Sequence, residues 1–159
     1  MEFGAGASTA EAAHRNIPMI SVETDPYYLN AVRKKISPNP TCELIYWNIG
    51  LTTKWGYPIL KRSQPSWRKY AELPFDRGFS PELILVDGRF RVHCALQAIS
   101  RLSDFELLFD DYGDRECYRA VEQFAKLDRM YGRMAVFKPK NFDRTALNRA
   151  IEQYWQDYR

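Results

Sequence analysis

Continuous apolar runs alternate along the chain with segments whose apolar positions recur at helical spacing. The clearest run, residues 81–87 (PELILVD), is typical of a parallel strand buried on both faces. Residues 90–102 follow it with the periodicity of a helix. This alternation predicts an α/β fold, a doubly wound and mostly parallel sheet with helices on both faces. The predicted strands are residues 1–3, 18–22, 42–49, 81–87, 106–109 and 133–137.

The last third of the chain is predicted to be mainly helical. In residues 114–131 the apolar positions Val121, Phe124 and Leu127 fit one face of a helix, and Gly132 fits the residue that ends it. Residues 143–158 form a second amphipathic pattern after the strand at 133–137. The pattern therefore predicts no strand beyond residue 138.

The first segment reads as strand, glycine loop, helix and second strand. Glycines at 4 and 6 allow a turn in which no Cβ obstructs a ligand. Ser8 and Glu11 have the spacing of a capping box at the start of the helix. Glu23 ends the second strand seventeen positions after Gly6, close to the roughly 20-residue spacing at which an acidic side chain binds a ribose. An adenosine-containing cofactor is therefore expected.

The type of cofactor follows from the residues around the glycines. A dinucleotide loop has a third glycine where this chain has Thr9, and Glu2 would lie close to the pyrophosphate. Residues 2–6 (EFGAG) instead resemble the E/D-x-G-x-G motif of class I S-adenosylmethionine-dependent methyltransferases. Residues 22–26 (VETDP) resemble the acidic loop after their second strand. Since that cofactor is a cationic sulfonium without phosphate, an acid beside the loop is compatible with it.

The resemblance covers nearly the whole chain and implies a Rossmann-like sheet with strand order 3-2-1-4-5 plus a last strand. These enzymes usually end with a seventh strand paired to the sixth, which the pattern does not predict here. Glu2 would lie near the cofactor's ammonium group, Glu23 would bind the ribose hydroxyls and Asn48 the adenine. The cofactor-binding residues that the resemblance implies are Glu2, Gly4, Ala5, Gly6, Glu23, Asn48 and Asp87.

Catalysis requires a residue that aligns the methyl acceptor or takes its proton. Asp87 follows the strand that faces the methyl group in the family, and it is the leading base or orienting residue. Asp111 and His93 are further catalytic candidates. A lone histidine such as His93 more often makes a structural hydrogen bond, so that alternative stays open.

A magnesium site is a further hypothesis. Asp87, Asp110 and Asp111 resemble the acidic ligands of metal-dependent O-methyltransferases, and three oxygen ligands suit Mg²⁺. In the pair after the fifth strand, however, that family usually has an Asn where this chain has a second Asp. Alternatively, one aspartate caps a turn and another pairs with an arginine. The nearby arginines, which would balance the aspartates or bind an anionic substrate, are Arg89, Arg91 and Arg115.

The chain of 159 residues is expected to form a single methyltransferase-like domain, 1–159, that is short at its N-terminal strand and therefore truncated there. Residues 50–80 are expected to be an irregular excursion on the substrate side. They mix aromatic with basic side chains, which could bind nucleic acid or could pack on the edge of the sheet.

Composition narrows the possible partners. A net charge of +3 gives no indication of nucleic-acid binding. No apolar run approaches the roughly 20 residues of a membrane helix, and the three cysteines have no metal-ligand spacing. We therefore expect a cytoplasmic protein with a small-molecule substrate and no membrane partner, and a homodimer stays open as a hypothesis.

Together these features predict an S-adenosylmethionine-dependent methyltransferase that acts on a small molecule. Two alternatives remain at this point. One is a non-catalytic protein that keeps the fold for binding or assembly, and the other is an NAD-binding oxidoreductase, which Thr9 and Glu2 disfavour.

Overall fold

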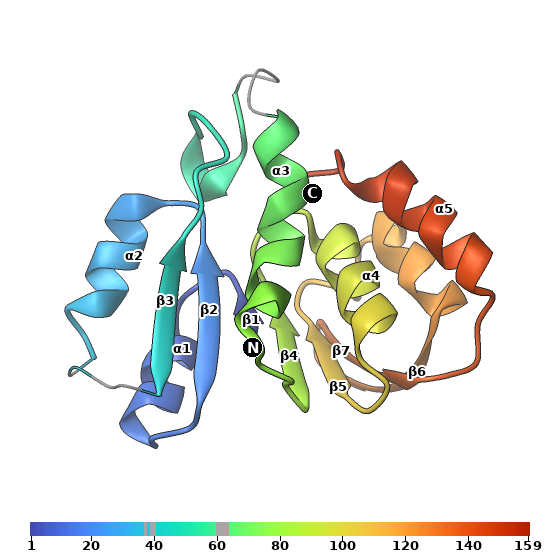
Figure 1. Ribbon diagram of the computed structural model, residues 1–159, viewed down its shortest axis with the longest axis horizontal. Coiled ribbons are helices and arrows are strands. Elements are labelled where there is room, and N and C mark those ends of the chain that lie inside the picture. Colours follow the sequence, from blue (N-terminus) through green and yellow to red (C-terminus); the bar gives the residue numbers. More distant parts are fainter. Residues whose placement is uncertain (37, 39–40, 60–63) are drawn as a thin grey trace.

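The computed structural model describes residues 1–36, 38, 41–59 and 64–159. Within these residues the sheet has seven strands in the order β3-β2-β1-β4-β5-β7-β6 (Figure 1). The strands from β3 to β5 run parallel, and β7 and β6 are antiparallel additions. This arrangement confirms the predicted fold class. The strands are β1 (Glu2–Phe3), β2 (Met19–Glu23), β3 (Cys42–Tyr46), β4 (Leu83–Val86), β5 (Glu106–Phe109), β6 (Ala125–Tyr131) and β7 (Met134–Pro139).

Helices cover both faces of the sheet. On one face, Leu29 and Val32 of α2 pack against Leu44 of β3. On the other face α3, α4 and α5 form a row in front of the sheet, and the main hydrophobic core lies beneath them (Figure 1). No helix among the described residues is long and apolar enough to cross a membrane. The helices are α1 (Ala7–His14), α2 (Pro26–Arg33), α3 (Gln64–Glu72), α4 (Arg91–Arg101) and α5 (Arg144–Tyr154), with the 3₁₀ helices η1 (Lys54–Gly56), η3 (Leu73–Arg77) and η4 (Glu116–Gln123).

The short strand β1 lies at the centre of the parallel part. Phe3 is fully buried and pairs with Val22 of β2 on one side and Val86 of β4 on the other. Because neighbouring parallel strands end at the same edge of the sheet, the loops after them emerge together there. This edge therefore brings the glycine loop next to Glu23 and Asp87.

The prediction of one helix over 114–131 is wrong beyond its first turns. The segment forms η4 and then β6, which turns back through Gly132 into β7. Gly132 has φ 58°, and a glycine in this left-handed conformation serves a helix end and a tight β turn equally well. The seventh strand that the pattern did not predict is present, and β7 lies between β5 and β6.

Part of the excursion at 50–80 folds back on itself. Thr52 forms an antiparallel bridge with Pro58, and the backbone N–H of Ile59 donates to Leu51 O at 2.8 Å. We call residues 51–59 the hairpin loop. It lies at the edge where β2 and β3 end (Figure 1).

The remainder of this stretch is more regular than predicted. It contains α3 and η3, and the fully buried rings of Trp67 and Tyr70 anchor α3 in the main core. The basic side chains Lys61 and Arg62, part of the predicted aromatic and basic pattern, lie outside the described residues.

Candidate active site

The loop after β1 and the loop after β4 are in direct backbone contact. Gly4 has φ 97°, a conformation that side chains rarely allow, and a Cβ there would lie 2.7 Å from Gly88 N. Gly88 is equally constrained, because a Cβ would collide with the hydroxyl group of Tyr70. The two glycines thus let the strand ends approach more closely than side chains would permit.

Helix α1 begins directly after Gly6, and Thr9 caps it. The Thr9 hydroxyl accepts a hydrogen bond from Gly6 N–H at 2.8 Å and donates one to Glu2. The predicted capping box is not formed, because Ser8 donates to Glu2 and Glu11 pairs with an arginine one turn further on. Thr9 stands where a dinucleotide loop has its third glycine, and it binds the N–H of Gly6, the N-cap residue of α1.

Glu2 lies beneath the glycine loop rather than in an open cleft. It is fully buried, and its carboxylate accepts hydrogen bonds from the hydroxyl groups of Ser8, Thr9 and Ser21, the last at 2.9 Å. A buried carboxylate requires such donors. This placement corrects the expected contact with the cofactor's ammonium group: Glu2 holds the loop and α1 against β2.

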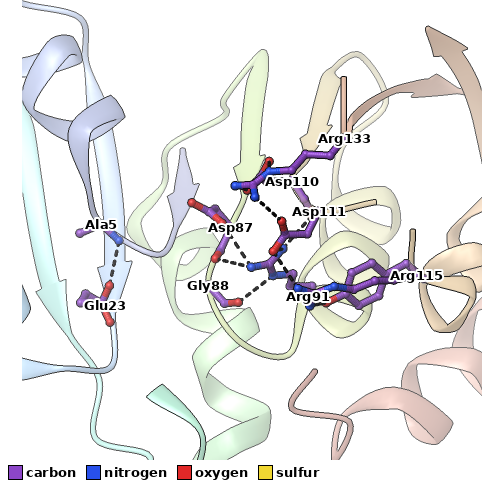
Figure 2. Close-up of polar contacts among 10 residues, drawn as sticks. Ala5, Glu23, Asp87, Gly88, Arg91, Asp110, Asp111, Arg115 and Arg133 are labelled. Carbon is purple, nitrogen blue, oxygen red and sulfur yellow. Dashed lines mark hydrogen bonds and ion pairs between the residues drawn. The ribbon is translucent and has the colours of Figure 1, made fainter. Parts of the chain in front are cut away.

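Glu23 reaches from the end of β2 to the glycine loop. Its Oε2 accepts a hydrogen bond from Ala5 N–H at 3.0 Å (Figure 2). Its Oε1 accepts from the backbone N–H groups of Thr24 and Asp25 at 2.6 and 2.9 Å. Burial raises the pKa of Glu23, and the backbone donors oppose that rise. Since each carboxylate oxygen can accept more than one hydrogen bond, a ligand hydroxyl can still bind there.

Arg91 connects the loops after β4 and β5 (Figure 2). Its side chain is 3% exposed, and every N–H group of its guanidinium has an acceptor. The charge is balanced by two carboxylates, as a buried cation requires. The acceptors are Gly88 O at 3.0 Å from Nε, Asp110 O and Asp111 Oδ2 at 2.7 and 3.1 Å from Nη1, and Asp87 O and Oδ1 at 3.0 and 3.2 Å from Nη2.

The predicted magnesium site is not formed. Asp110 pairs with Arg133 at 3.0 Å, and Asp111 pairs with Arg115 at 3.0 Å in addition to its bond from Arg91 (Figure 2). In the described part of the chain, no group of three or more His, Cys, Asp or Glu side chains could hold a metal ion. The hypothesis that Asp87, Asp110 and Asp111 bind Mg²⁺ is therefore corrected, because arginines already bind the carboxylates that would face the metal.

Asp87 differs from the other two aspartates because its side chain is 49% exposed. Desolvation raises its pKa to about 6, with a smaller contribution from Asp110, while Arg91 opposes the rise. A carboxylate with this pKa is ionised at neutral pH and is a better proton acceptor than an ordinary aspartate. Asp87 therefore remains available for chemistry at the end of β4.

The structure places His93 away from this edge. It is fully buried on α4, where the backbones of Arg68 in α3 and Ile151 in α5 lie close to its ring. Burial lowers its pKa to about 4, so the imidazole is neutral. The catalytic assignment of His93 is therefore corrected to a structural one.

Asn48 lies after β3, at the same edge as the glycine loop. Its side chain is exposed, and its Oδ1 accepts a hydrogen bond from Gly50 N–H at 2.8 Å. In this structure Asn48 stabilises the turn that leads into the hairpin loop.

Strand order, glycine loop and the acidic end of β2 together define an α/β protein with a methyltransferase-like fold. A comparison with solved structures agrees with this assignment. The chain is 31% identical to a methyltransferase-like protein from Silicibacter pomeroyi DSS-3, and the TM-score with its crystal structure is 0.84. The match covers 98% of this chain and 86% of that chain, so this chain belongs to the methyltransferase-like proteins. No protein-family model and no curated protein matches it.

Proposed function

We propose that the chain is an S-adenosylmethionine-dependent methyltransferase that acts on a small molecule. The observation that carries this proposal is the hydrogen bond between Ala5 N–H and Glu23. It fixes a carboxylate beside a loop of two glycines and an alanine, at the edge of the sheet where ligands bind in this fold. An acid in this position binds the ribose hydroxyls of an adenosine group.

The hydrogen bonding of the loop favours a cofactor without phosphate. A pyrophosphate binds free N–H groups at the start of a helix. In the glycine loop that leads into α1, Ala5 N–H already donates to Glu23 and Gly6 N–H to Thr9. A phosphate would also meet the negative charge of Glu23. These contacts support a cationic sulfonium cofactor over NAD.

The remaining roles follow from position. The backbone of Gly4 to Gly6 would approach the methionine part of the cofactor, and Asn48 would lie on its adenine side. The bound cofactor would supply an electrophilic methyl group. Asp87 would orient the acceptor and take its proton as the new bond forms, and its raised pKa suits that function. Asp111 would position Asp87 indirectly through Arg91, which binds both carboxylates.

Replacing Glu23 with alanine tests the cofactor site. Hydrogen bonds to a charged group are worth about 1.5–3 kcal/mol, so the Kd for S-adenosylhomocysteine should rise roughly tenfold to hundredfold. Isothermal titration calorimetry measures this change. Glu11→Ala removes the same charge from the exposed face of α1 and should leave the Kd unchanged. Equal affinities for wild type and Glu23→Ala would contradict the assigned role.

A further inference from the structure

Arg89 is a buried cation whose charge nothing in the described structure balances. The residue is 7% exposed, and its Nη1 has no hydrogen-bond partner among the described residues. No carboxylate of those residues lies within ion-pair distance of it. Its guanidinium lies 4.4 Å from the ring centre of Tyr57. This cation–π contact is attractive, but it supplies no oxygen acceptor for the unpaired Nη1.

The neighbouring arginines show what Arg89 lacks. Arg91, Arg115 and Arg133 each pair with an aspartate of the strand-end loops. The remaining residues of the chain cannot supply a carboxylate for Arg89 either. Those outside the described ranges are Ser37, Asn39, Pro40, Leu60, Lys61, Arg62 and Ser63, none of which is acidic.

Arg89 lies where the hairpin loop meets the loops after β2 and β4. A Cβ on Gly56 would be 3.3 Å from Thr24 Oγ1 and 3.6 Å from Arg89 Cγ, so the hairpin loop is close to both. The ring of Tyr57 also meets that of Tyr158 in the C-terminal segment edge-on, with ring centres 6.1 Å apart. Arg89 is therefore bordered by the hairpin loop and, through Tyr57, by the C-terminal segment.

We infer that Arg89 binds an anionic group, a carboxylate or a phosphate, on the methyl acceptor. An unpaired buried cation is costly, and a ligand anion would provide the missing partner. A guanidinium is well suited to this, because it binds either group through paired N–H donors. We assign the anion to the methyl acceptor rather than to the cofactor. The proposed cofactor site lies at Ala5 and Glu23, whereas Arg89 is bordered by Tyr57 and, through it, by Tyr158. This inference rests on the proposed methyltransferase function.

The test is an NMR titration of the full chain, with and without S-adenosylhomocysteine, at constant ionic strength. The probes are inorganic phosphate, benzoate and the uncharged analogue benzamide. We expect phosphate or benzoate to bind and benzamide not to bind. Arg89→Gln should raise the Kd of the anion at least about tenfold, since it removes a charge-assisted hydrogen bond. Arg89→Lys keeps the charge but not the paired donors, so its Kd for the anion should lie between those of wild type and Arg89→Gln.

Arg15→Gln is the matched control, because Arg15 is exposed at the C-terminal end of α1 and pairs with Glu11. It should bind the anion as wild type does. The melting temperature of Arg89→Gln should be no lower than that of wild type, because the substitution removes an unbalanced charge; a structural arginine would lower it. The tighter of the two anions identifies the acceptor group as carboxylate or phosphate.

Three results would overturn the inference. The first is that wild type binds neither anion, and the second is that Arg89→Gln binds it as tightly as wild type. The third is a loss of S-adenosylhomocysteine affinity in Arg89→Gln with anion binding intact, which would assign Arg89 to the cofactor. Anion binding through Arg89 by a wild-type chain that binds no S-adenosylhomocysteine would support the anion site and contradict the proposed methyltransferase function.

Discussion

Replacing Arg91 with methionine is expected to lower the free energy of unfolding by about 3–5 kcal/mol, because it removes a buried guanidinium that donates all its hydrogen bonds to the strand-end loops. Arg91 supplies hydrogen bonds to the carbonyl groups of Asp87, Gly88 and Asp110 and to two carboxylates. Without it the three carbonyl groups and Asp87 lose this donor, whereas Asp111 keeps its pairs with Arg115 and Arg133, and the loops after β4 and β5 lose their connection. Urea denaturation of the variant and wild type measures the difference.

Arg115→Met provides the matched control for this prediction. Arg115 also pairs with Asp111, but its side chain is 38% exposed, so its loss should cost at most about 1 kcal/mol. The pKa of Asp87 should rise further in Arg91→Met, since Arg91 opposes the increase. Equal stability of Arg91→Met and Arg115→Met would contradict the central role of Arg91.

Acidification should destabilise the fold through His93. Its pKa is lowered from 6.5 to about 4 by burial, so between these pH values the unfolded chain binds a proton that the folded chain does not. Stability therefore falls as the pH decreases from about 6.5 to about 4, by a total on the order of 3 kcal/mol. Denaturation curves measured across this range give the slope.

His93→Leu should remove this part of the pH dependence, because leucine does not titrate. His14→Gln is the control, since His14 is exposed on α1, and it should retain the slope of wild type. An unchanged slope in His93→Leu would show that other groups cause the acid destabilisation.

Most of the sheet follows from local sequence. The apolar run before Asp87 and the short strand before Gly4 both form parallel strands, and their order is the one implied by the motif in residues 2–6. The error in residues 114–131 has a local cause. Val121 and Phe124 have helical spacing, whereas burial alternates residue by residue from Ala125 to Arg129, as in a strand. Because the two patterns follow each other within a few residues, the helical one is extended too far.

The site is less predictable, because its contacts join loops that are far apart in sequence. Glu23 could be identified from its spacing to Gly6. The burial of Glu2 depends on Ser21, a hydroxyl on a neighbouring strand. Arg91 binds mainly backbone carbonyl groups, which carry no sequence signal. The unbalanced charge of Arg89 is visible only once the partners of the other arginines are known.

The cofactor assignment is the central claim, and calorimetric titration of the purified chain with S-adenosylmethionine, S-adenosylhomocysteine and NAD tests it most directly. We predict that the first two ligands bind with Kd values in the micromolar range and that NAD does not bind. Binding of NAD without the other two, or no binding at all by a folded sample, would contradict the proposed function and favour an oxidoreductase or a non-catalytic protein, respectively.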